Sequence, residues 1–371
     1  MPANTAAWIN AKHARLEVGP APYPTPADDQ IVVRNHAVAI NPLDWIIQVE
    51  GTLLYNWLKY PTVLGSDTAG EVVDVGRAVT RFRVGDRVLG HAVGTDKDSN
   101  SAAEGTFQQY TAVLERLAAP IPDTMTYQDA CVLPLALSTA ASALFQKDQL
   151  AMRHPSANPA PTGETLLVWG GSTSVGSNAI QLAVAAGYEV ITTASPGNFD
   201  YVRSLGAAQV FDYHSPSVIP DIIAAFRGRT LAGAIAFGTT SAPSCVRIVG
   251  ACQGNRFVAI ATPPVSFSTL ADGNRFEFPR ILLKLISANV ALQFRSRIRG
   301  IRTKYIFGSS LKTNEVSNAI YHDFLPAALA DGRYVAAPKP SVVGTGLHDI
   351  QHAMDIQLKG VSAAKIVVTL Q

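Results

Sequence analysis

The feature that most constrains the fold of this chain is a glycine-rich turn at residues 168–176 (Val-Trp-Gly-Gly-Ser-Thr-Ser-Val-Gly). Residues 164–169 have the pattern of a buried parallel strand, and residues 177–186 that of a helix ended by Gly187. Glycines allow the backbone to approach a ligand closely, and the N–H groups that begin a helix can bind a pyrophosphate. An ordinary strand-to-helix turn is the alternative. The residues expected to bind the phosphates are Gly170, Gly171, Ser172, Thr173, Ser174, Val175 and Gly176.

The end of the next strand indicates which dinucleotide would bind. Residues 188–194 form a second apolar run. It ends at the position where a dinucleotide-binding fold contacts the ribose of its ligand. An NAD site usually places Asp or Glu there to accept a hydrogen bond from the 2′-OH. This chain has Ser195, followed by Pro-Gly-Asn-Phe. A carboxylate would repel a 2′-phosphate, whereas a hydroxyl and backbone N–H groups can donate to it, so the sequence favours NADPH. The alternative is that Ser195 only starts a turn.

Composition fits a well-buried globular protein and argues against several classes of partner. The chain has 371 residues, of which 47% are hydrophobic and 16% charged, with a net charge of +2. This small net charge argues against nucleic acid as a binding partner. No apolar run approaches the roughly 20 residues of a membrane span. The N-terminus lacks the pattern of a secretion signal, so a cytoplasmic location is expected. The cysteines are Cys131, Cys245 and Cys252, which form no disulfide or CxxC pattern and are expected to be structural.

Three blocks follow one another along the chain. Residues 1–125 contain short alternating runs with turn signals, which indicate a small, bent β domain. Residues 126–305 alternate strands and helices, which predicts a doubly wound parallel sheet with covered faces. Residues 306–371 contain a predicted helix at 315–330 and a last strand at 364–370, and are expected to complete the first domain. The strands expected in the first block are 30–40, 68–76 and 84–89, and the further strands expected in the second block are 205–213, 233–238 and 256–261.

The order of motifs resembles that of the medium-chain dehydrogenase/reductase superfamily over nearly the whole chain. Within it the chain is most similar to the zinc-independent, quinone-reductase-like branch and to trans-acting enoyl reductases of fungal polyketide synthases, of the lovastatin type. The superfamily motifs are Ala39-Ile-Asn-Pro-Leu-Asp44, Leu64-Gly-Ser-Asp-Thr-Ala-Gly-Glu-Val-Val-Asp-Val-Gly76, Gly85-Asp-Arg-Val88, Gly105-Thr-Phe-Gln-Gln-Tyr110, Leu133-Pro-Leu-Ala-Leu-Ser-Thr-Ala140 and Leu205-Gly-Ala207. The subgroup features are Gly170–Thr173, Ala194–Asp200, Phe211–Tyr213, the Pro-rich insertion 154–162 and Ile306–Gly308.

The resemblance implies a GroES-like catalytic domain (1–125, completed by 306–371), a Rossmann NADP-binding domain (126–305) and a set of site residues. It places the turn Asn41–Asp44, Ser138-Thr139 and the segment Ile306–Gly308 beside the nicotinamide. The catalytic candidates are Asp44 and Thr139; for Asp44 the alternative is a turn or capping role. The additional residues expected at the cofactor are Asn41, Pro42, Thr139, Asn198, Tyr213, Gly238, Ala261, Ile306, Phe307 and Lys365.

The resemblance also raises the question of zinc. Zinc-dependent members hold the metal with a Cys after the first core strand and a His-Glu pair in the glycine motif, because catalytic zinc needs three protein ligands. Here those positions contain Asn41 and Gly65-Ser66-Asp67, so we expect no metal. Without a Lewis acid, the natural chemistry is conjugate reduction, in which charge develops on an enolate oxygen and the α-carbon takes a proton. A Lys usually follows the Asp of this motif; here Trp45 follows, and solvent is left as the expected proton source.

The sequence therefore predicts an NADPH-dependent enoyl reductase acting on a carrier-bound polyketide thioester together with its synthase. The alternatives are a quinone or enone reductase and a non-catalytic NADPH-binding protein. A monomer or weak dimer is expected, on the premise that insertion 154–162 lies where relatives pair their cofactor domains. The basic run 295–304 carries five cations, and as an extended strand it would place Arg295, Arg297 and Arg299 on one face. That face could meet a phosphopantetheine or an acidic carrier; a solvated edge strand is the alternative, and the one favoured.

Overall fold

The computed structural model describes residues 2–51, 54–271 and 277–370. The chain forms two compact units, one of residues 1–135 with 311–371 and one of residues 136–310. These boundaries lie five to ten residues beyond those expected from the sequence. Helix α2 (Tyr127–Ala130) explains the first shift, because it packs on β3 and β5 of the first unit. Its Tyr127 ring stacks on His36 and lies under the Arg87 guanidinium.

The first unit is built on two antiparallel-rich sheets. A three-stranded sheet has the order β2-β1-β4, and a seven-stranded sheet has the order β15-β16-β3-β5-β6-β8 with β7 paired to β3. The strand bounds are β1 Asn4–Ile9, β2 Leu16–Ala21, β3 Gln30–Ala39, β4 Thr62–Val63, β5 Asp67–Val75, β6 Arg87–His91, β7 Tyr110–Leu114, β8 Ala118–Pro120, β15 Lys339–Thr345 and β16 Ala364–Thr369. The helices are α1 Pro42–Glu50, α9 Leu325–Ala330 and α10 Ile350–Lys359.

The main core of the first unit lies between the small sheet, the large sheet and the paired helices α1 and α10. Ile9, Ile47, Val63 and Met354 are all fully buried there. The helix predicted at 315–330 is present in two parts, a π-helical stretch Asn318–Phe324 followed by α9. The C-terminal strand Ala364–Thr369 pairs antiparallel with β3 of the first unit.

The second unit is a six-stranded parallel sheet of order β11-β10-β9-β12-β13-β14. In chain order this is 3-2-1-4-5-6, the doubly wound arrangement that binds ligands at the switch point between its first and fourth strands. The strands are β9 Glu164–Trp169, β10 Glu189–Ala194, β11 Gln209–Asp212, β12 Thr230–Ala236, β13 Phe257–Ile260 and β14 Arg302–Tyr305. The helices are α3 Pro134–Phe145, which begins at the unit boundary, α4 Ser174–Ala185, α5 Phe199–Ser204, α6 Val218–Ala225, α7 Ser241–Ala251 and α8 Glu277–Ile298.

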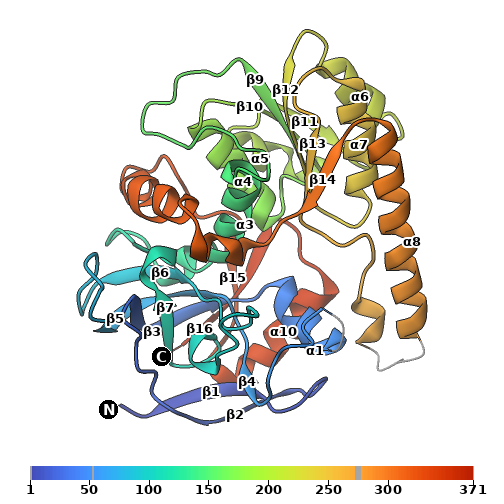
Figure 1. Cartoon of the computed structure of the whole chain (residues 1–371). Helices are drawn as coiled ribbons and strands as arrows, with labels where there is room; N and C mark the ends of the chain where they lie inside the picture. The colour runs from blue at the N-terminus through green and yellow to red at the C-terminus, as the bar shows by residue number, and fades with distance from the viewer. Residues whose placement is uncertain (1, 52–53, 272–276, 371) are drawn as a thin grey trace. The chain divides into compact units, whose positions relative to one another are not determined.

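Helices cover both faces of this sheet. Figure 1 shows α6, α7 and α8 together on one side and α4 and α5 on the other. Ile248 of α7, Val258 of β13 and Leu292 of α8 belong to one buried cluster between these layers. Of the described segments, Tyr127–Phe145 has the length and apolar composition of a membrane span, and 78% of the tested window is buried, as in a core helix.

The basic run 295–304 does not form the extended strand that its alternation suggested. The helix α8 continues to Ile298, and only residues 302–305 form a strand, β14. The apolar residues before the run recur at helical spacing, and burial of Ile281 and Leu292 against the domain fixes the helix through Arg295 and Arg297. Arg295, Arg297 and Arg299 therefore do not share the face of one strand.

The Pro-rich insertion 154–162 lies against the C-terminal end of α4. Ser156 and Thr162 donate their N–H groups to Ala185 and Gly187, and the Arg153 guanidinium donates to Ala186. These partners belong to α4 and the turn after it, at the amino end of β10, and not to the edge strand β14. The expectation of a monomer therefore gains no support from the position of this loop.

Candidate functional site

The glycine-rich turn is formed as the sequence predicts, between β9 and α4. Gly170 has φ +91°, a conformation that favours glycine. A Cβ at Gly171 would lie 2.2 Å from Thr192 Oγ1, and one at Gly176 would lie 2.2 Å from the Gly170 carbonyl oxygen. The second and third glycines are thus required because the turn packs directly on β10 and on the start of its own helix.

The same turn supplies donors for an anion. Thr173 caps α4: its Oγ1 accepts from Gly176 N at 3.0 Å and donates to the Gly170 carbonyl oxygen at 2.8 Å. An α-helix leaves its first-turn N–H groups without intrahelical acceptors, so those of Ser174 and Val175 are suited to a phosphate. The main chain and the capped side chain are held before any ligand arrives.

Gly238 lies on the other side of the switch point between β9 and β12. Gly238 follows β12, has φ +100°, and is held by a hydrogen bond from its N–H to Thr262 Oγ1 at 3.1 Å. No described atom lies within 4 Å of the position that a Cβ would take at Gly238. Gly170 and Gly238 therefore lie at the carboxyl ends of two neighbouring parallel strands, the place where doubly wound folds bind dinucleotides.

The predicted ribose end lies beside this turn. Ser195 follows β10, and Asn198 donates its Nδ2 to Ser195 Oγ at 3.4 Å and its N–H to the Ser195 carbonyl oxygen at 2.9 Å. Ala194 is paired with Asp212 of β11, so Tyr213, with 43% of its surface exposed, follows at the same edge. The structure brings these three predicted residues to neighbouring strand ends.

Asp212 is a residue that the sequence reasoning missed. Its Oδ1 accepts from the N–H and the Nδ1 of His214 at 3.0 and 3.1 Å. A carboxylate at the strand end next to Ser195 opposes a 2′-phosphate unless a cation compensates for its charge. Asp212 could have been identified from the sequence, because it ends the strand expected next to residues 188–194.

The predicted nicotinamide end of the second unit is assembled from three segments. Ile306 donates its N–H to the Ile260 carbonyl at 2.9 Å, so the chain leaves β14 beside Ala261. Gly308 packs on α3, since a Cβ there would lie 2.7 Å from Thr139 Oγ1. Phe307, between them, is 68% exposed. Thr139, Ala261 and residues 306–308 thus lie at one end of the sheet.

The predicted residues of the first unit gather around a buried ion pair. Lys365 of β16 is 4% exposed, and its Nζ lies 2.9 Å from Asp67 Oδ2 of β5. Asn41 connects the two, because its Oδ1 accepts from Lys365 Nζ and its Nδ2 donates to Asp67 Oδ2 at 2.8 Å. The Leu135 N–H donates to the other Asp67 oxygen at 2.6 Å. The contacts of Lys365 place its ammonium within this unit; its predicted contact with the cofactor stays a prediction.

This cluster does not suit zinc. The carboxylate that would serve as a ligand, Asp67, already holds the Lys365 ammonium and two N–H donors, and a dication beside an ammonium would be strongly repelled. Across residues 2–51, 54–271 and 277–370, no group of three or more His, Cys, Asp or Glu side chains could hold a metal ion. The cation of this cluster is the ammonium group of Lys365.

Two titratable groups adjoin the ion pair. Burial raises the pKa of Asp44 to about 7 and Asp67 adds to the rise, whereas the Asn41 N–H and the Lys365 ammonium oppose it. Burial lowers the pKa of His91 to about 4, which keeps its imidazole neutral. Asp44 is 1% exposed and its Oδ2 accepts from Asn41 N at 2.7 Å. These are the contacts of a capping residue at the start of α1, and the catalytic role of Asp44 stays a prediction.

Comparison with known proteins gives the class. Residues 27–123 match the family model "Alcohol dehydrogenase GroES-like domain". The chain is 52% identical to "Dehydrogenase pigH" of Monascus ruber, over 100% of each chain. It is 39% identical to "Trans-enoyl reductase himH" of Aspergillus japonicus (99% of this chain, 97% of that protein). It is 38% identical to "Lovastatin nonaketide synthase, enoyl reductase component lovC" of Aspergillus terreus (60% of this chain, 59% of that protein).

The chain belongs to the medium-chain dehydrogenase/reductase superfamily, and its relatives include proteins named trans-enoyl reductase and enoyl reductase component. It is an oxidoreductase whose fold implies a nicotinamide cofactor.

The first prediction is that lysine, and not a metal, stabilises the first unit. Elemental analysis should find no stoichiometric zinc, and a chelator should leave the free energy of unfolding in urea unchanged. Lys365→Met should lower that free energy by about 3–5 kcal/mol, because it leaves a buried carboxylate without its cation. Lys304→Met is the control: its ion pair with Asp148 is 48% and 63% exposed, so a change of about 1 kcal/mol or less is expected. One zinc per chain, with activity restored by zinc after chelation, would contradict the prediction.

The second prediction concerns pH. Asp44 has a pKa of about 7 in the folded chain and an ordinary value of 3.8, so the folded state retains a proton that the unfolded state loses between these values. The stability that Asp44 contributes is therefore present below pH 3.8 and is lost as pH rises through 7. Relative to Asp44→Asn, the wild type should lose about 2–4 kcal/mol of unfolding free energy between pH 4 and 8. Urea unfolding of both proteins measures this difference, and titration of His91 cancels in it. A difference that does not vary with pH would show that Asp44 ionises normally.

Proposed function

We propose that the protein is an NADPH-dependent enoyl reductase that reduces the α,β-double bond of a polyketide thioester. The observation that carries the proposal is the buried Lys365–Asp67 pair, in which Asp67 belongs to the motif that supplies zinc ligands in zinc-dependent members of the superfamily. An ammonium held by a carboxylate and an amide inside the unit is not an open Lewis-acid position, so activation of an alcohol or ketone by zinc is not supported. Reduction of a conjugated C=C needs less activation, because the thioester carbonyl already draws charge from the alkene.

Residues of the second unit would bind the cofactor, which supplies a hydride when bound. The N–H groups at the start of α4 and the Thr173-capped turn would take the pyrophosphate. Ser195, Asn198 and Tyr213 would take the ribose bearing the 2′-phosphate. Thr139 and the segment 306–308 would orient the nicotinamide and exclude water from one side of it. In the first unit, Asn41 and Pro42 are proposed to border the same ring.

The proton for the α-carbon is proposed to come from solvent. The side chain of Asp44 is buried and accepts backbone hydrogen bonds from Asn41 and Gly65, so it is poorly placed to deliver a proton. Trp45, at the position where a lysine is common, donates its Nε1 to Gln357 at 2.6 Å and offers no acid. Neither side chain supplies the acid that a buried protonation step would need.

The names of two relatives support a synthase as partner. One is a trans-enoyl reductase, and another is the enoyl reductase component of a nonaketide synthase. We propose that this chain likewise acts in trans, on a thioester carried by the carrier protein of a polyketide synthase, in the cytoplasm and as a monomer. A reductase of free quinones or enones is the second candidate, supported by the same metal-free cluster. A non-catalytic NADPH-binding protein is the candidate from a different class.

The third prediction separates these candidates. The purified protein should oxidise NADPH in the presence of a crotonyl-type thioester, with kcat/KM at least about ten times that for a simple quinone. The physical reason is that a thioester makes its β-carbon electrophilic without a metal. Absorbance of NADPH measures the rate, and product analysis should show a saturated acyl chain. Faster quinone reduction would favour the second candidate, and NADPH binding without turnover on any acceptor would favour the non-catalytic one.

The fourth prediction tests the ribose end. Ser195→Asp places a second carboxylate beside Asp212, where it would face the 2′-phosphate of NADPH and accept from the ribose 2′-OH of NADH. Like charges about 4 Å apart cost on the order of 1–4 kcal/mol, so the NADPH/NADH affinity ratio should fall roughly ten-fold to several-hundred-fold. Ser195→Ala is the matched control, which removes one donor without adding charge and should change the ratio by about ten-fold or less. Dissociation constants measured by calorimetry provide the ratio. An unchanged ratio in Ser195→Asp, or a wild type that prefers NADH, would make Ser195 an ordinary turn residue.

A further inference from the structure

Helix α8 presents an apolar stripe to solvent. Its five members and their exposed fractions are Leu283 (69%), Ile286 (53%), Val290 (63%), Phe294 (65%) and Ile298 (67%). Spacings of three and four residues place all five on one face of the helix, over a length of about 22 Å. Exposed apolar patches of a few hundred Å² are uncommon on proteins that act alone, and they mark interaction surfaces.

Folding of the second unit does not account for this stripe. The helix is anchored through a different face, where Ile281, Leu292 and Ser296 are buried at 6%, 4% and 1% exposure. Gln293 Nε2 also donates to Thr303 Oγ1 at 3.0 Å, which fixes the helix to β14. The stripe therefore lies outside the packing that holds α8 in place, and replacing its members should leave the unit folded.

The surface around the stripe is cationic. Within α8, residue 277 is the one carboxylate of the sequence, and it is paired with Arg280 at 2.9 Å. Four arginines follow toward and beyond the C-terminal end of the helix: Arg295, Arg297, Arg299 and Arg302. Lys284, in the first half of the helix, is exposed as well, so charge and apolar surface occur side by side, and the arginines named above add cations at the C-terminal end.

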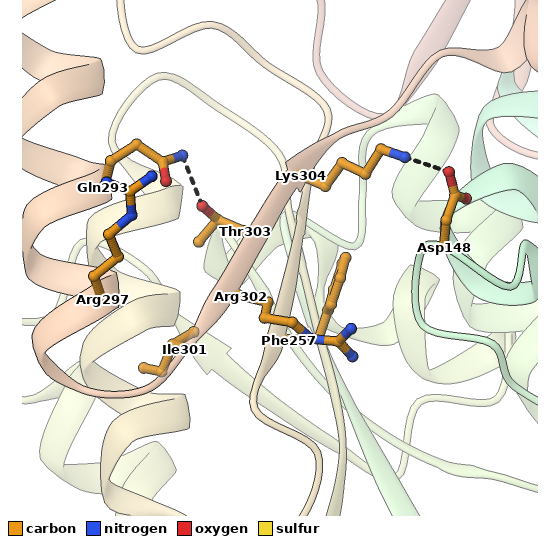
Figure 2. A pocket seen from close by; sticks show the side chains of 8 residues that line it. All are labelled: Asp148, Phe257, Gln293, Arg297, Ile301, Arg302, Thr303 and Lys304. Atoms are coloured by element: carbon orange, nitrogen blue, oxygen red, sulfur yellow. Dashed lines mark hydrogen bonds and ion pairs between the residues drawn. The ribbon is translucent and has the colours of Figure 1, made fainter.

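A hollow of about 370 Å³ lies at this end, between α8 and the edge strand β14. Figure 2 shows its lining, with Arg297 on the helix beside Gln293 and Arg302 against the Phe257 ring. The Arg302 guanidinium carbon lies 5.1 Å from that ring's centroid. Lys304, which also lines the hollow, is paired with Asp148. The hollow therefore offers the guanidinium groups of Arg297 and Arg302 to an anionic group.

We propose that α8 and the adjoining hollow form a docking surface for another protein, whose contact face carries apolar side chains flanked by carboxylates. The stripe would bury against the partner's apolar side chains, and Arg297 and Arg302 would pair with its carboxylates. The inference does not depend on the reaction proposed above, since the surface is defined by α8 and β14 alone.

Charge and shape favour such a protein over a second copy of this chain and over a lipid bilayer. A second copy of this chain would bring the arginines of one α8 against a helix whose single carboxylate is already paired, so its cations would have no counter-charge. A lipid bilayer presents a flat surface, which cannot fill the hollow beside the helix. A protein with an acidic, apolar face satisfies both features.

The test uses a defined probe. A fluorescently labelled 22-residue helical peptide with Leu at the spacing of the stripe and Glu at flanking positions should bind the full chain with micromolar affinity, measured by anisotropy. The same peptide with Lys in place of Glu should bind at least ten-fold more weakly. Affinity should fall at least ten-fold in the triple variant Ile286→Ser/Val290→Ser/Phe294→Ser and in Arg297→Glu/Arg302→Glu. Val84→Ser, which removes an isolated side chain 62% exposed in the first unit, should bind as the wild type does.

Several results would overturn the proposal. One is equal binding of the Glu and Lys peptides, and another is equal binding by the triple variant and the wild type. Binding to vesicles containing anionic lipid, lost in the triple variant, together with no binding of the Glu peptide would assign the surface to a membrane. A dimer in light scattering that the triple variant abolishes would assign it to self-association. Urea unfolding and NADPH affinity of each variant should match the wild type, which shows that a loss of binding is local to this surface.

Discussion

The buried pair of Lys365 and Asp67 is the interaction on which the arrangement of the first unit depends. It joins the C-terminal strand β16 to β5, and through Asn41 it includes the junction between β3 and α1. The Leu135 N–H adds the start of α3. Segments from positions 41, 67, 135 and 365 therefore meet at one carboxylate. Desolvation of two charges is costly, and it is offset here because Asp67 receives three donors, so the pair is stable only when all of these segments are in place.

The same cluster connects stability to chemistry. In a protein that uses zinc, a dication would polarise the substrate at this position. Here an ammonium and a carboxylate neutralise each other inside the unit, and the neighbouring His91 and Asp44 are held toward their neutral forms by burial. This arrangement is consistent with the proposed reaction, in which the thioester carbonyl of the substrate would itself activate the double bond. In the proposed reaction, backbone N–H groups of the second unit would bind and orient the cofactor.

The second unit shows how backbone geometry prepares a site before a ligand binds. Gly170 and Gly238 adopt left-handed conformations at the ends of β9 and β12, on the two sides of the switch point. Thr173 caps α4 and closes the turn by donating to Gly170. These features are local, and each is encoded within a few residues. Local encoding explains why the strand at 164–169, the helix that follows it and the glycine turn could all be predicted from the sequence.

The sequence by itself determined the strand-turn-helix of the second unit and the division into a β-rich and a doubly wound part, because each depends on residue type and short-range spacing. Only the tertiary structure decided that Lys365, which was expected at the cofactor, pairs with Asp67. The two residues lie about 300 positions apart in the chain, and their pairing depends on β16 lying beside β3 and on β3 lying beside β5. The same holds for the run 295–304, whose alternation suggested a strand, whereas burial of Ile281 and Leu292 fixes a helix. Periodicity shows which faces a segment can present, but the neighbours that cover those faces decide which conformation is kept and which surface stays exposed.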